Sequence, residues 1–227
     1  MAKQSQRIPS KSYLRFESVI KRSLNLLSLQ QAVEKLFAGQ KSPPDASDMT
    51  RAAVTLAVAG MDAYFTGVFA ERLVPFLKKK KTPPKALCDL LQKAGLDTAT
   101  AIELLGMDRP YRRIRKLMDC HLEKHVSQRI DVIDELFLSY GLKDFCDHAQ
   151  RKAKRRNLLK SIQRLVERRH EIAHKGDVNS HGRLQKITPT QIKTLVMHLV
   201  KFVASADEIL QGQLASIKEH GHAKKTS

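Results

Sequence analysis

The chain has 227 residues, of which 42% are hydrophobic, and a formal net charge of +18 at pH 7. This length and apolar content are enough to build one sizeable core, and the excess of Lys and Arg predicts a polyanionic partner, most often a nucleic acid. The lack of Trp and the small share of aromatic residues weaken the case for a surface that binds single strands by base stacking.

The spacing of apolar residues predicts an all-α protein. Residues 1–10 are polar and precede a predicted amphipathic helix over 13–37, which is followed by a loop that contains Gly and Pro. The next predicted helix, residues 49–77, is the most hydrophobic and is expected to form the centre of the core. Its longest apolar run, near residues 52–61, is too short to cross a bilayer, so no membrane partner is expected.

Four shorter helices are predicted next, over 85–94, over 97–105, from Pro110 onward and over 126–140. One long basic helix is then expected over about 144–175, with Gly176 ending it. Thr188 and Pro189 begin a last helix.

These elements divide the chain into three parts. Residues 1–47 are expected to form an N-terminal helical extension, residues 48–212 a helical domain, and residues 213–227 a polar, disordered tail. The chain has no apolar segment behind its first residues, and its three cysteines form no CxxC pair. Both features predict a protein of the reducing cytoplasm.

A metal site is not predicted. His121 and His125 have the i, i+4 spacing of a ligand pair, and Cys120 is adjacent, but no second pair with suitable spacing accompanies them. No Gly-rich phosphate loop occurs either. We therefore expect neither a metal nor another cofactor.

Basic residues occur along the predicted helix 144–175, and none of the positions 148–166 is acidic. Lys160, Arg164 and Arg168 repeat at every fourth position, and Arg155 and Arg156 precede them. Like charges at this spacing destabilise an isolated helix, and a polyanion relieves the repulsion. We therefore predict that these side chains bind RNA phosphates, together with Lys175 at the helix end. A solvated helix face is the alternative.

Arg169 falls in the middle of the apolar stripe of this helix, between Leu165 and Ile172. A buried Arg is costly unless something pairs with it. One explanation is an ion pair with a core acid, for which Asp62 is a candidate, and a His174 that the helix dipole favours at the helix end. The other explanation is a functional site made of Arg169, His170 and His174.

The spacing of these residues resembles the signature of the HEPN domain superfamily. Arg169 and His174 are separated by four residues near a helix end, and the polar His170 follows the Arg directly. The run Ile172-Ala173-His174, with Gly176 shortly after it, is similar to the corresponding stretch of the RiboL-PSP-like HEPN group. A long hydrophobic helix upstream also fits, and the likeness extends over about 48–212.

The resemblance implies an antiparallel helical bundle and a metal-independent endoribonuclease that leaves 2′,3′-cyclic phosphate and 5′-hydroxyl ends. It implies Arg169, His174 and His170 as catalytic residues, Asp62 as a supporting residue, and a homodimer with the site at its interface. A role as a toxin or antiviral-defence effector, with a cognate antitoxin or defence partner, follows from the same resemblance. The alternatives are a non-catalytic RNA-binding scaffold and a helical module that binds an acidic protein.

Overall fold

The computed structural model describes residues 9–41, 45–80, 82–124 and 128–222, and beyond residue 213 only their backbone. Within these ranges the chain forms nine α-helices and no strand, with one isolated antiparallel bridge in a loop. The prediction of an all-α protein is confirmed. The helices are α1 (Lys11–Leu36), α2 (Ser47–Lys79), α3 (Lys85–Lys93), α4 (Thr98–Leu105), α5 (Pro110–Leu122), α6 (Ile130–Leu138), α7 (Phe145–Lys152), α8 (Leu158–Lys175) and α9 (Pro189–His222).

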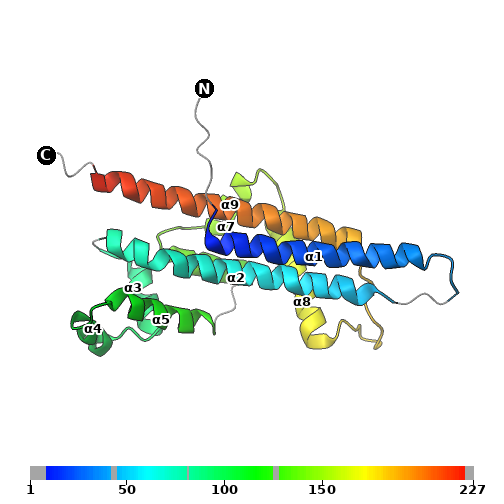
Figure 1. The fold of residues 1–227 in the computed structure, drawn as a ribbon, viewed down its shortest axis with the longest axis horizontal. Coiled ribbons are helices and arrows are strands. Elements are labelled where there is room, and N and C mark those ends of the chain that lie inside the picture. Colours follow the sequence, from blue (N-terminus) through cyan, green and yellow to red (C-terminus); the bar gives the residue numbers. More distant parts are fainter. Residues whose placement is uncertain (1–8, 42–44, 81, 125–127, 223–227) are drawn as a thin grey trace, which may run out of the picture.

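Three long helices form the body of the bundle. Helices α1, α2 and α9 lie side by side, and α1 runs antiparallel to the other two (Figure 1). Helix α8 packs against α2 and α9, and α7 packs against α6, α8 and α9. Helices α3, α4 and α5 lie together beside the C-terminal half of α2 (Figure 1). The end of α8 and the loop to α9 lie at the edge of the bundle.

Helix α2 is the centre of the core, as predicted. Phe65 on this helix is fully buried, and its ring lies 5.7 Å from that of Phe202 and 6.0 Å from that of Phe137, between centroids. By length and composition alone α2 is apolar enough to cross a membrane, unlike the shorter run considered in the sequence. However, 56% of its most apolar window is buried inside the bundle, and core helices of soluble proteins satisfy the same test.

Helix α1 shares this core. Its side chains Phe16, Ile20 and Leu27 are buried in the same cluster as those of α2. The two helices approach closely at Gly67, where a Cβ atom would lie 2.6 Å from Ser12 Oγ. Since α1 has no separate core of its own, it is part of the bundle and not an extension that ends at residue 47.

The prediction of one helix over 144–175 is wrong, because two helices occupy this range. Helix α7 ends at Lys152 and α8 begins at Leu158. Between them, Lys154 and Asn157 adopt left-handed conformations, with φ of 50° and 61°. Residues 154–157 offer no apolar side chain to the core and carry three adjacent positive charges, so neither packing nor electrostatics favours a continuous helix there.

The last helix is longer than expected. Helix α9 continues to His222, so the backbone of residues 213–222 is helical and does not form the start of a disordered tail. The remaining residues of the predicted tail, 223–227, lie outside the described residues.

Candidate functional site at the end of α8

The C-terminal end of α8 is closed by two residues in the left-handed conformation. Gly176 has φ 63° and Asp177 has φ 59°. The backbone N–H of Asp177 returns to the last turns of the helix and donates to the carbonyl oxygen of Glu171 at 3.1 Å. This arrangement satisfies a carbonyl that the helix end would otherwise leave open, and glycine adopts its conformation without a steric cost. It also directs Asp177 back toward the bundle.

The buried face of α8 becomes partly exposed toward this end. Leu158, Ile162 and Leu165 are buried, whereas Arg169 and Ile172 on the same face are only half-buried. Within the described part of the chain, no hydrogen bond or ion pair is made by the Arg169 side chain. Arg169 therefore lies on the apolar face, as predicted, but at its open end.

The ion pair between Arg169 and Asp62, one of the two explanations considered for Arg169, is not formed. Asp62 lies half-buried on α2, and the structure places a different acid, Asp177, between α2 and α8. Asp177 pairs with Arg51 and Arg168 and not with Arg169, so it does not take the place of Asp62 as a partner of Arg169.

His170 and His174 lie one turn apart on the exposed side of α8. Their ring centroids are 4.6 Å apart, with an angle of 43° between the ring planes. Arg169 and His174 are five residues apart, which on an α-helix corresponds to about 140° around the axis. One chain therefore presents the two histidines together and Arg169 on another side.

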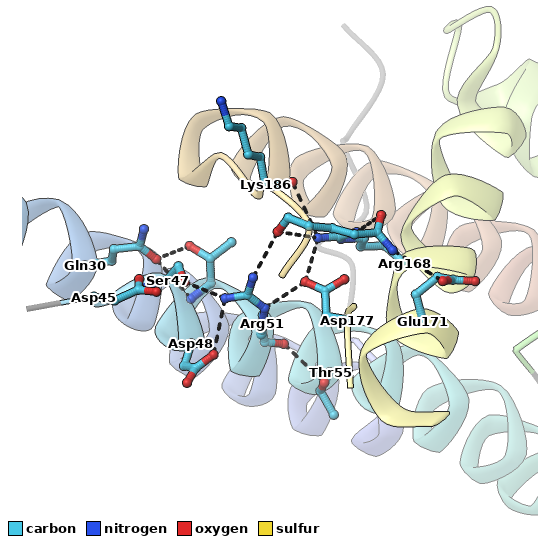
Figure 2. Close-up of polar contacts among 12 residues, drawn as sticks. Gln30, Asp45, Ser47, Asp48, Arg51, Thr55, Arg168, Glu171, Asp177 and Lys186 are labelled. Atoms are coloured by element: carbon cyan, nitrogen blue, oxygen red, sulfur yellow. Dashed lines mark hydrogen bonds and ion pairs between the residues drawn. The ribbon is translucent and has the colours of Figure 1, made fainter. Parts of the chain in front are cut away.

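Asp177 is held by two arginines. Its side chain is 0% exposed, and its Oδ2 atom accepts hydrogen bonds from Arg51 Nε and from Arg168 Nη2, both at 2.7 Å. Figure 2 shows Arg51 of α2 and Arg168 of α8 converging on the carboxylate. Charge-assisted hydrogen bonds of this kind are among the strongest polar contacts in proteins.

Gln185, in the loop between α8 and α9, completes the group. Its carbonyl oxygen accepts from Arg51 Nη2 at 3.0 Å, and its side-chain oxygen accepts from Arg168 Nη1 at 2.9 Å. Its backbone N–H donates to the carbonyl oxygen of Asp177 at 2.8 Å. We call Arg51, Arg168, Asp177 and Gln185 the Asp177 clamp. It ties α2, the end of α8 and the following loop together.

The other predicted RNA ligands do not form one row on one helix. Lys160 and Arg164 are exposed on α8, whereas Arg155 and Arg156 are exposed in the turn between α7 and α8. Arg168 contributes its guanidinium group to the clamp, so it does not share the surroundings of the other four. The basic surface thus bends at the break between the two helices.

The surroundings of Glu171 and His198 lower the pKa of each side chain. Lys175 Nζ donates to Glu171 Oε1 at 2.9 Å, and this contact, before any other, lowers the pKa of Glu171. Burial lowers the pKa of His198 on α9, and the nearby charge of Arg155 lowers it further. Lys175, predicted to bind RNA, is exposed but already paired with an acid of its own helix.

A comparison with family models identifies the fold. The model of the RiboL-PSP-HEPN family matches residues 17–212. The chain belongs to the RiboL-PSP-HEPN family. No curated protein and no solved structure matches it. The match includes most of α1, in agreement with the shared core, and it indicates an RNA-related or nuclease-like HEPN domain.

Three members of the clamp in this HEPN domain were not predicted from the sequence: Arg51, Asp177 and Gln185. A signal for Arg51 was present, because it precedes the buried residues Val54 and Val58 by three and seven positions and so shares their face of α2. The same criterion singled out Arg169. Asp177 and Gln185 lie in a polar loop, where no periodicity marks a buried residue.

Among the residues of the HEPN domain that the structure describes, no group of three or more His, Cys, Asp or Glu side chains is placed to hold a metal ion. His121 belongs to α5, and its predicted companion His125 lies outside the described residues.

Proposed function

We propose that this HEPN domain is an endoribonuclease that uses Arg169, His174 and His170 without a metal ion. The observation that carries the proposal is the end of α8, where a half-buried Arg169 makes no polar contact in the described residues and two exposed imidazole rings lie 4.6 Å apart. Membership of the RiboL-PSP-HEPN family supports an RNA substrate.

The proposed chemistry needs one base, one acid and one cation. A neutral imidazole, that of His174, removes the proton of a ribose 2′-OH, whose oxygen attacks the adjacent phosphorus. The bond from phosphorus to the 5′-oxygen breaks, and a protonated imidazole, that of His170 or of a second copy, donates a proton to this oxygen. Arg169 stabilises the charge of the phosphoryl oxygens. The products are a 2′,3′-cyclic phosphate and a 5′-hydroxyl, and the need for a 2′-OH selects RNA over DNA.

A second copy of the chain is part of the proposal. Arg169 and His174 point to different sides of α8, and the apolar face that carries Arg169 is left partly open. Two large apolar side chains in the following loop, Val178 and Leu184, are 39% and 52% exposed. A homodimer that covers this region would bring Arg169 and a histidine of two chains to one phosphate.

The cellular role that fits an RNA-cleaving domain of this kind is that of a toxin or antiviral-defence effector. Its activity would then be controlled by a cognate antitoxin or another defence partner. A non-catalytic RNA-binding scaffold is the second candidate function. It is favoured by the exposed cations Lys160 and Arg164, which bind phosphate without any need for the histidines.

The decisive experiment compares wild type with His174→Ala on labelled RNA in the presence of EDTA. We expect the wild type to cleave and to leave cyclic phosphate ends, and His174→Ala to lose at least about a hundredfold in rate, as expected for removal of a general base. His148→Ala is the matched control, because His148 is an exposed histidine on α7. Full activity of His174→Ala would exclude the proposal, and binding without cleavage by the wild type would favour the scaffold.

A further inference from the structure

Arg168 differs from the basic residues that precede it on α8. In the sequence it continues the spacing of Lys160 and Arg164, which suggests one role for all three. In the structure Arg164 is exposed, whereas only 16% of the Arg168 side chain is exposed. The Arg168 guanidinium donates hydrogen bonds to Asp177 and to the side-chain oxygen of Gln185. The fold therefore already supplies the acceptors that an RNA phosphate would offer.

The clamp reaches the turn of α8 that carries the histidines. Asp177 follows His174 by three residues, and its backbone N–H is bonded to Glu171, which lies between the two histidines. Through Arg51 the same carboxylate is bonded to α2, the most buried helix of the bundle. These bonds connect the turn of α8 that carries His174 to the core through Asp177 and its two arginines.

The buried carboxylate of Asp177 is compensated by the positive charges of Arg51 and Arg168. Asp177 is completely buried, and its second oxygen, Oδ1, has no hydrogen-bond partner within the described residues. A buried carboxylate without compensating charge is strongly destabilising, so the loss of both arginines would endanger the fold itself. Loss of Arg168 alone leaves the Arg51–Asp177 pair in place and removes the bonds that join α8 to the carboxylate and to Gln185.

We infer that Arg168 and Asp177 are positioning residues for His174, and that Arg168 is not a ligand of the RNA. This inference rests on the proposed ribonuclease activity. Arg168 fixes the last turns of α8 against the loop carboxylate, and a general base performs its reaction only when it is held within hydrogen-bonding reach of its proton. A residue that positions His174 affects turnover, whereas a phosphate ligand affects binding.

The test compares Arg168→Ala with Arg164→Ala, two substitutions of the same kind one helical turn apart. For Arg168→Ala we expect kcat to fall about tenfold to a hundredfold through misplacement of His174. RNA affinity, measured in a His174→Ala background that prevents cleavage, should stay within about twofold of its value with Arg168 intact, because no phosphate contact is lost. For Arg164→Ala we expect the effect to fall on RNA affinity, with weaker binding and a shallower salt dependence, because an exposed phosphate contact is lost.

Arg168→Lys separates positioning from bulk stability. A Lys ammonium reaches one acceptor, while the Arg fork bonds Asp177 and Gln185 together. We expect partial recovery of kcat in this variant, with RNA affinity again unchanged. Weaker RNA binding by Arg168→Ala, with kcat intact and the salt slope reduced by about one contact, would overturn the inference and make Arg168 a phosphate ligand.

A measurement without RNA keeps this inference separate from the proposed function. If the wild type cleaves no RNA, the ribonuclease proposal fails, and amide hydrogen exchange then decides on the positioning role. Arg168→Ala should accelerate exchange at Asp177 and Gln185, whose N–H groups are bonded to Glu171 and Asp177. Arg164→Ala should leave these amides unchanged. Equal exchange in both variants would overturn the role of Arg168 in holding the end of α8.

Discussion

Arg168 and Arg169 are neighbours in the sequence, yet their side chains have different surroundings. The Arg168 guanidinium is bonded to a buried carboxylate, whereas Arg169 makes no polar contact within the described residues. About 100° of rotation separates successive residues on a helix, so one Arg faces the loop and the other the open end of the apolar face. Only the second is available to a substrate or to another copy of the chain.

Arg169→Ala should therefore impair function without unfolding the protein. We expect cleavage to be lost and self-association to weaken, while the free energy of unfolding changes by less than about 1 kcal/mol, since no polar partner is left unpaired. Sedimentation velocity, chemical denaturation and the RNA assay measure these three quantities. A variant that cleaves like the wild type, or that fails to fold, would contradict this assignment of Arg169.

The break between α7 and α8 determines how the basic residues are arranged. Arg155 and Arg156 lie in the turn, while Lys160 and Arg164 lie on α8. Asn157 makes the turn possible, because its left-handed φ of 61° starts α8 in a new direction. Asn adopts this conformation more readily than most residues, since its short polar side chain tolerates it.

Substitutions at Asn157 test this explanation of the break. Asn157→Val places a β-branched side chain in the left-handed region and should lower the free energy of unfolding by about 1–3 kcal/mol. Asn157→Gly should leave stability nearly unchanged, because glycine adopts this φ freely and the Asn side chain makes no capping hydrogen bond. Denaturant titration of both variants is the measurement. Similar stability of the Val and Gly variants would show that the conformation of residue 157 does not control the turn.

At the scale of the whole molecule, most charged side chains lie on the surface and the apolar ones form the core. The net charge of +18 resides mainly on exposed side chains, whereas the core is built from apolar residues of α1, α2, α3, α5, α6, α7, α8 and α9. Two arginines, Arg51 and Arg72, are exceptions, because each is buried and bonded inside the bundle. The remaining cations give the surface a positive charge, which should attract polyanions.

RNA binding should consequently depend strongly on salt. With about four phosphate contacts, affinity should fall at least tenfold between roughly 50 and 200 mM monovalent salt, through the release of counterions. Fluorescence anisotropy with the His174→Ala protein measures this without cleavage. An affinity for RNA that does not change with salt would contradict a phosphate-binding surface. Tighter binding to an acidic protein would favour the alternative of a helical module that binds such a protein.

Much of the architecture could be predicted from local sequence features. The apolar spacing of α2 predicted the core helix, and Gly176 and Pro189 marked the end of α8 and the start of α9. The break at residues 153–157 was not predicted, although a signal for it was present: on one continuous helix the buried residues of α7 and those of α8 would lie about 180° apart. The Arg-His spacing led to the HEPN family, which the family match confirms, while the catalytic role of Arg169, His170 and His174 stays a prediction.

The sequence by itself determined the helical class, the family and the candidate residues, because composition, periodicity and motif spacing are local properties of a chain. Only the tertiary structure decided that Arg168 is bonded to Asp177 and that Arg169 makes no polar contact within the described residues. Arg51 and Asp177 are 126 residues apart, and their contact exists because α2 and α8 pack together and the loop folds back between them. Such a pairing depends on the geometry of packing, which no local pattern specifies.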